Sequence, residues 1–346
     1  MALPLPAAFA EEEPVTVLDA GELQALVEEF LSAERMDPKL VSIGFLYAET
    51  GEEWYYNADQ WYYSASLYKV PLTMLVANMV ARGELEQTDR LYGTPLTVSE
   101  ELILRHSSND HAHLLMNWFW PKNRECRELW PALAGMEGED FPQSFYLQSY
   151  FSAPFITRVF DTLCRDPDSY PMVTDYLLLA QPGEYLRREL GDGVPIAQKY
   201  GSYEQFGHVS GIIFRDRPIV VTLLTQCTTR VSERSGKLAA LLCDYADTLD
   251  ARLDERWEAI RLQATEEEAR REEEARQAEE ERRRAAQAAQ EAVREAAAEE
   301  PAEAPPERTG TLPAAPIAAA AAITAALTGG LVLARRKRKQ AGEKSL

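Results

Sequence analysis

A serine and a lysine stand three residues apart in the stretch SASLYKVPLTMLVANMV, residues 64–80. The apolar run predicts a helix over about 66–80, which would place Ser66 and Lys69 on one face with Cβ atoms about 5–6 Å apart. A serine hydroxyl is a weak nucleophile and needs a base within hydrogen-bond reach. Desolvation lowers the pKa of a lysine, so Lys69 can supply that base. For this pair alone, the ordinary alternative is an N-cap serine followed by a surface lysine.

Two later stretches add polar residues in an ordered pattern. RHSSNDHAHLL places Ser107 and Asn109 before a helical run, and IAQKYGSY places Lys199, Gly201 and Ser202 in a predicted strand. Alternate residues of a strand share a face, so Lys199 and Gly201 should point to the same side of the sheet. Together with the first stretch, these residues add polar groups that could gather around a serine nucleophile and its base.

The three stretches resemble the S-x-x-K, S-x-N and K-x-G motifs of penicillin-binding proteins and class A β-lactamases, in the same order. The resemblance covers roughly residues 20–250. It implies that Ser66 attacks an acyl carbon, that Lys69 takes its proton, and that Ser107 relays a proton to the leaving nitrogen. Lys199 is grouped with these catalytic residues. The resemblance implies that it binds a carboxylate of the substrate.

The remaining motif residues are implied to bind substrate. Asn109 would hold a side-chain amide of the substrate and help to position Lys69. Gly201 would let the substrate lie close to the strand. The backbone N–H groups of Ser66 and Ser202 would form an oxyanion hole, which is usually a large contribution in acyl transfer.

Departures from the family pattern concern both the motifs and the hydrolytic step. Ser108 replaces the usual aspartate of S-D-N, and Tyr200 replaces the usual threonine of K-T-G; strand alternation predicts that Tyr200 faces away from Lys199. Class A enzymes also hold a hydrolytic water with a Glu and an Asn of an Ω-loop, and no asparagine follows Asn123 here. The segment at about the right place offers three carboxylates as substitutes: Glu137, Glu139 and Asp140.

Strand and helix patterns predict an α+β fold with an antiparallel five-stranded sheet flanked by helices, plus an all-helical subdomain. Two strands come early, around a turn at Gly51, and three come late, in residues 196–226. A helical stalk and a transmembrane helix follow. The expected divisions are 1–10 for a signal-peptide remnant, 15–253 for the hydrolase-like domain, 254–300 for the charged helical stalk, 301–313 for a Pro-rich linker, 314–334 for the transmembrane helix and 335–346 for a basic cytoplasmic tail.

Composition narrows the partners. A net charge of -20 argues against nucleic acid, which requires a basic surface. Four scattered cysteines and four histidines show no metal-ligand spacing, so neither a metal nor another cofactor is expected, and a disulfide framework is not expected either. Residues 309–334 carry no charge and precede RRKRK, a pattern typical of a membrane span with its C-terminus inside. This pattern predicts a domain on the extracellular face of a bacterial membrane, whereas the alternative for the span is a disordered Ala-rich tail.

These expectations lead to one preferred function and two alternatives. The preferred function is a β-lactamase-like serine hydrolase that forms an acyl-enzyme at Ser66, opens a β-lactam amide bond and deacylates slowly. One alternative is a D-Ala-D-Ala peptidase or transpeptidase that acts on cell-wall peptides. The other is a non-catalytic surface protein on a degenerate fold of the same kind.

Overall fold

A five-stranded antiparallel sheet forms the centre of the structure, a computed structural model that describes residues 15–120, 123–191 and 193–298. The strand order is β2-β1-β9-β8-β7, so β2 and β7 are the two edges. The predicted strands are confirmed: β1 (Val41–Tyr47), β2 (Glu52–Tyr56), β7 (Ile196–Tyr203), β8 (Phe206–Ile213) and β9 (Ile219–Thr225). The β1–β2 hairpin turns at Gly51, whose φ of +76° is a conformation that favours glycine.

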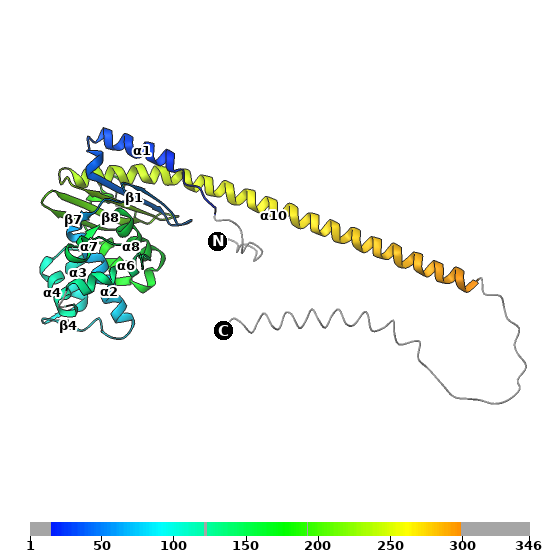
Figure 1. Cartoon of the computed structure of the whole chain (residues 1–346), viewed down its shortest axis with the longest axis horizontal. Coiled ribbons are helices and arrows are strands. Elements are labelled where there is room, and N and C mark those ends of the chain that lie inside the picture. Colours follow the sequence, from blue (N-terminus) through cyan, green and yellow to red (C-terminus); the bar gives the residue numbers. More distant parts are fainter. Residues whose placement is uncertain (1–14, 121–122, 192, 299–346) are drawn as a thin grey trace, which may run out of the picture. The chain divides into compact units, whose positions relative to one another are not determined.

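Side-chain alternation along the strands divides the core into two clusters, one on each face of the sheet. Ile43, Phe45 and Tyr47 of β1 pack with α1 (Ala20–Ala33) and the first part of α10 (Val231–Ala298). Leu46, between them, belongs to the opposite cluster, which includes α8 (Ala153–Arg165). Figure 1 shows α1 and α10 running together along one face of the sheet. Because helices cover both faces, β1, β8 and β9 are buried along their whole length.

The remaining helices form the all-helical part. They share the cluster that contains α8, around an aromatic group that includes Trp130, Phe145 and Phe155. The helices of this part are α2 (Lys69–Ala81), α3 (Leu96–Leu104), α4 (Asn109–Phe119), α5 (Asn123–Glu128), α6 (Trp130–Leu133), α7 (Gln143–Gln148) and α9 (Pro171–Leu178). Two short two-stranded sheets are also present: β3 (Tyr62–Tyr63) pairs with β6 (Tyr150–Phe151), and β4 (Arg90–Leu91) pairs with β5 (Thr94–Pro95). None of these four short strands was predicted. The four cysteines are free.

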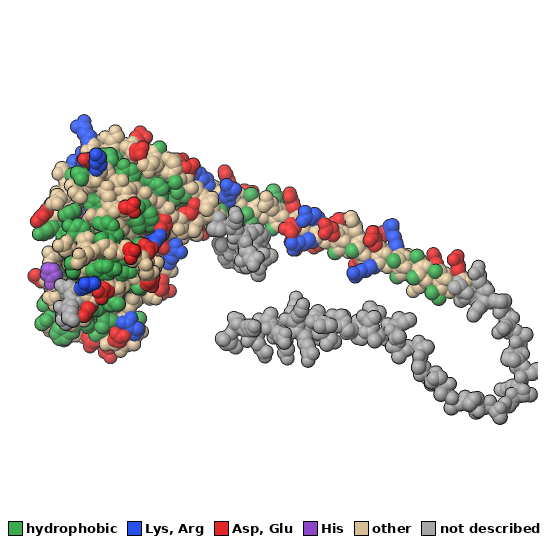
Figure 2. Space-filling view, viewed as in Figure 1, with side chains coloured by type: hydrophobic (Ala, Val, Ile, Leu, Met, Phe, Trp, Pro, Cys, Tyr) green, Lys and Arg blue, Asp and Glu red, His purple; other side chains and the backbone are tan. Residues whose placement is uncertain are grey.

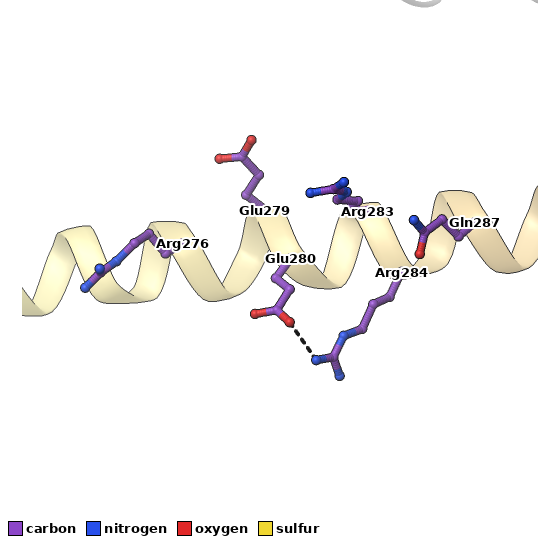
Figure 3. A pocket seen from close by; sticks show the side chains of 6 residues that line it. All are labelled: Arg276, Glu279, Glu280, Arg283, Arg284 and Gln287. Carbon is purple, nitrogen blue, oxygen red and sulfur yellow. Dashed lines mark hydrogen bonds and ion pairs between the residues drawn. The ribbon is translucent and has the colours of Figure 1, made fainter.

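The charged segment is helical, as its sequence indicates, and α10 continues to Ala298. The compact unit that contains the sheet ends at Glu268. Figure 2 shows acidic and basic side chains interspersed along the rest of α10, and Figure 3 shows how they project from a single helix. Glu280 pairs with Arg284 at 2.6 Å, and Arg276 pairs with Glu273. Exposed pairs of this kind stabilise a helix by only about 0.3–0.5 kcal/mol each.

Several predicted segments lie outside the described residues: the signal-peptide remnant at 1–10, the linker at 301–313, the transmembrane helix at 314–334 and the tail at 335–346. Within residues 15–298, apart from the two short gaps, no helix is long and apolar enough to cross a membrane.

One buried carboxyl group of the helical part has no hydrogen-bond partner among the described residues. Glu100 of α3 is 1% exposed, and neither of its carboxyl oxygens has a hydrogen-bond partner among the described residues. Burial raises the pKa of this group from 4.5 to about 8. Because the unfolded chain releases the proton near pH 4.5 and the folded protein only near pH 8, rising pH in this window favours unfolding.

Glu100→Gln should therefore stabilise the protein at pH 8 by a few kcal/mol and leave its stability near pH 4.5 almost unchanged. Urea unfolding at the two pH values measures both effects. Glu101→Gln is the matched control, because Glu101 forms a partly exposed ion pair with Arg105 at 2.7 Å and should change stability little. An equal effect of Glu100→Gln at both pH values would contradict the assignment.

Candidate active site

The nucleophile candidate lies in a tight turn and not at the cap of an α-helix. Residues Ala65–Tyr68 form a 3-10 helix, and α2 begins only at Lys69. Ala65 has a φ of +46°, an unfavourable conformation for a residue with a Cβ. The predicted helix over 66–80 is confirmed, with the difference that its first turn is a 3-10 helix and the α-helix begins at Lys69. The turn leaves Ser66 partly exposed while Lys69 is 0% exposed.

Strand β7 is packed directly against this turn. A Cβ on Gly201 would lie 2.9 Å from the carbonyl oxygen of Ser64 and 2.9 Å from the backbone nitrogen of Ser66. The absence of a side chain at 201 is thus required by the protein's own backbone, and not only by a substrate that lies close to the strand. The same packing places the backbone of β7 beside the N–H of Ser66, as an oxyanion hole requires, and the next residue, Ser202, is exposed.

A buried histidine holds the other side of the turn. His208 of β8 is 0% exposed, its Nε2 lies 2.8 Å from the carbonyl oxygen of Tyr63, and its Nδ1 accepts from the N–H of Thr225 at 3.2 Å. With Nδ1 as the acceptor, Nε2 carries the proton and donates a hydrogen bond to the carbonyl oxygen of Tyr63. Burial lowers the pKa of His208 to about 4, so the ring is neutral at physiological pH. Sequence reasoning missed this positioning residue, because only the pairing of Gly201 with His208 reveals its place.

Lys69 contacts the other predicted site residues directly. Its Nζ lies 3.1 Å from Ser66 Oγ, 2.6 Å from the carbonyl oxygen of Ser107, 3.3 Å from Ser107 Oγ and 2.7 Å from Asn109 Oδ1. All four partners are neutral oxygens. The structure therefore brings Ser66, Lys69, Ser107 and Asn109 together, although they come from two separate segments of the chain.

A second buried lysine approaches from β7. Lys199 is 0% exposed, and its Nζ donates to Ser107 Oγ at 2.9 Å and to the carbonyl oxygen of Tyr200 at 3.1 Å. Ser107 has a φ of +57°, a conformation that turns the chain sharply between α3 and α4. Its hydroxyl is thus the point at which both lysines meet.

Both lysines are shifted toward the neutral form. Burial lowers the pKa of Lys69 from 10.5 to about 8. Burial and the nearby charge of Lys69 hold the pKa of Lys199 well below its usual value. With this pKa, about a tenth of Lys69 is a free amine at pH 7, and a free amine 3.1 Å from Ser66 Oγ can accept its proton.

The two motif departures have different structural consequences. Ser108 is the N-cap of α4, and its Oγ accepts from the N–H of His111 at 3.3 Å, so serine performs a capping role that aspartate also suits. Tyr200 stacks on Tyr185 with ring centroids 5.0 Å apart. Its ring centroid is also 4.3 Å from Lys199 Nζ. The prediction that Tyr200 faces away from Lys199 was therefore incomplete, because the ring lies against the Nζ of Lys199.

The proposed substitutes for the deacylation base lie elsewhere. Glu139 pairs with Arg158 at 3.4 Å, and Arg158 also pairs with Glu53 of β2 at 3.0 Å. Strand β2 and the site strand β7 are opposite edges of the sheet, separated by three strands or about 19 Å. Glu137 and Asp140 are exposed on the same loop. Within the described residues, no carboxylate makes a hydrogen bond to Ser66, Lys69, Ser107 or Lys199.

Fold and site together are of the β-lactamase and penicillin-binding-protein type, and the comparisons identify the family of the chain. The family model described as "Beta-lactamase enzyme family" matches residues 22–110 and 133–246, which are more than half of the chain. The chain belongs to this family. No curated protein matches it.

Solved structures share the fold at low sequence identity. A β-lactamase from Chitinophaga pinensis is similar with a TM-score of 0.56 and 15% identity, over 65% of this chain and 99% of that one. A β-lactamase from Xanthomonas campestris pv. campestris gives a TM-score of 0.55 and 16% identity, over 66% and 99% of the two chains. The structure of PBP-A gives a TM-score of 0.54 and 16% identity, over 65% and 97%. These likenesses show the β-lactamase-like α+β fold.

The pKa of Lys69 predicts the pH dependence of its chemistry. Because only the neutral amine can act as a base, the rate of Ser66 acylation by a fluorescent penicillin should rise about tenfold per pH unit below about pH 8 and level off above it. Lys69→Arg, which stays protonated, should lower the rate at every pH. A rate that is flat between pH 6 and pH 9 would exclude Lys69 as the base.

Proposed function

We propose that this protein is a serine hydrolase that β-lactams acylate at Ser66 and that releases the acyl group slowly. The observation that carries the proposal is the contact set of Lys69, which reaches Ser66 Oγ at 3.1 Å with no carboxylate beside either group in the described residues. That arrangement supplies a base for acylation and leaves the hydrolytic water without one.

Acylation follows from the contacts. The neutral amine of Lys69 takes the proton of Ser66 Oγ, which attacks the carbonyl carbon of the β-lactam. The N–H groups of Ser66 and Ser202 bind the developing oxyanion. The C–N bond then breaks, and Ser107 Oγ, which lies 3.3 Å from Lys69 Nζ, passes the proton to the leaving nitrogen. A substrate carboxylate near Lys199 favours the charged form of this lysine. Substrate binding therefore protonates the buried amine, which then forms an ion pair with the carboxylate.

Deacylation lacks an equivalent base among the described residues. Hydrolysis of the ester requires a base that positions a water on the acyl carbon, and loss of a positioned general base costs about 10²–10⁴-fold in rate. The loop carboxylate Glu139 is held by Arg158 at the β2 edge of the sheet. The acyl-enzyme should therefore accumulate.

A penicillin should add one acyl group to the protein, and Ser66→Ala should abolish the adduct. Intact-mass spectrometry shows the adduct and its lifetime, and stopped-flow measurements with a chromogenic cephalosporin should show a burst followed by slow turnover. Glu139→Ala and Asp140→Ala serve as controls and should leave both the burst and the lifetime unchanged. The proposal would be falsified if no adduct forms and no cephalosporin is turned over.

A D-Ala-D-Ala peptidase or transpeptidase is the second candidate, because the same acylation chemistry applies to a cell-wall peptide. The lack of a base for the hydrolytic water favours a transpeptidase, since a transpeptidase transfers its acyl group to an amine and does not depend on rapid hydrolysis. A non-catalytic role is less consistent with the site. Two fully buried lysines without carboxylate partners destabilise a fold, and acylation chemistry gives them a purpose.

The location follows from the sequence pattern alone. We infer that residues 314–334 anchor the protein in a bacterial membrane, with the tail at 335–346 inside and the hydrolase domain on the extracellular face. Protease added to intact cells should then release a fragment that contains the Ser66 adduct. A fragment that is protected until the cells are lysed would place the domain inside.

A further inference from the structure

A cavity of about 250 Å³ borders the turn that carries Ser66. Tyr63 and Tyr68, which flank Ser66 in the sequence, line one side, and Gln148 and Ser149 at the end of α7 line another. The carbonyl oxygen of Ser149 accepts from the N–H of Ser64 at 3.0 Å, which ties the two walls together beside the nucleophile. The volume is smaller than the roughly 300–1,000 Å³ of a whole ligand site, so it suits one side chain of a substrate.

An arginine of α5 gives the cavity a positive charge. Arg127 is half-buried, its Nε donates to Ser149 Oγ at 2.8 Å, and its Nη1 donates to the carbonyl oxygens of Tyr146 and Leu147, each at 3.1 Å. None of these partners carries a charge. Nη2 donates no hydrogen bond within the described residues.

The other walls do not compensate this charge. Eight residues line the cavity, and none is acidic; His113 and Gln148 are exposed there. Burial raises the pKa of Tyr68 to about 12, so its hydroxyl is neutral. That hydroxyl also has no hydrogen-bond partner among the described residues. Arg127 is a cation whose charge is unpaired in a partly desolvated place, where pairing with an anion is worth more than at the surface.

We propose that this cavity binds a carboxylate on the acyl side of the substrate, with Arg127 as its partner. The inference rests on the proposed function, because it assigns the part of the substrate that stays on Ser66 in the acyl-enzyme. The substrate class is therefore an acyl donor with an acidic side chain, such as an acidic peptide or a β-lactam with a carboxylate in its acyl side chain. An arginine suits the position because Nε and Nη1 hold the guanidinium in place through the protein, while Nη2 remains to donate a charge-assisted hydrogen bond to the carboxylate.

Two penicillins test the proposal, because carbenicillin differs from benzylpenicillin only by a carboxylate on the acyl side chain. The second-order rate of Ser66 acylation should favour carbenicillin in the wild type. Arg127→Gln should lower the ratio of the two rates about tenfold, the factor expected for one charge-assisted hydrogen bond. Arg127→Lys should lower it less, because the charge remains. Arg124→Gln is the matched control, since Arg124 is an exposed arginine of the same helix that pairs with Glu128 at 2.8 Å, and it should leave the ratio unchanged.

Benzylpenicillin is the internal measure of folding and catalysis in every variant. An equal loss of both rates in Arg127→Gln would show that Arg127 only anchors the loop, and would overturn the inference. A wild type acylated equally fast by both penicillins would also overturn it and leave the proposed function intact. A wild type acylated by neither would overturn the proposed function and the inference with it.

Discussion

One hydroxyl group organises the site, because the two buried lysines meet at Ser107 Oγ, at 3.3 Å from Lys69 and 2.9 Å from Lys199. Neither lysine has an anionic partner in the described part of the chain, so each is shifted toward its neutral form. Burial without compensation is unfavourable for folding. It also produces the one property that acyl transfer requires of Lys69, a free amine near neutral pH beside a serine.

The fold serves to hold three separate segments around that hydroxyl. The β7–β8 hairpin delivers Lys199 and places Gly201 against the turn of Ser66, while His208 in the same hairpin binds the residue before the turn. Strain at Ala65 is tolerated because these contacts over-determine the turn. The loop that carries Glu139 does not contribute to this arrangement, because Glu139 pairs with Arg158, which also pairs with Glu53 of the edge strand β2.

Local patterns predicted most of the fold, and the failures have physical causes. Alternation and apolar periodicity placed the five main strands and the longer helices, and three ordered motifs selected the residues that surround Lys69. The 3-10 form of the first turn at Ser66 was not predicted, because the strained backbone at Ala65 depends on packing by Gly201 and not on local propensity. Glu139 was misplaced for a similar reason, since chain order near an Ω-loop does not specify which sheet edge the loop reaches. The pairings that place His208 and Arg127 are long-range and leave no local signal.

The central claim is that burial lowers the pKa of Lys69 enough to supply a free amine near neutral pH, and the titration of its side chain tests that claim most directly. Lysine labelled with ¹³C and ¹⁵N reports the protonation of each Nζ by NMR, and Lys69→Arg identifies the signal. The account predicts that Lys69 titrates near pH 8, well below an exposed lysine. A Lys69 signal that stays charged to above pH 10 would contradict it.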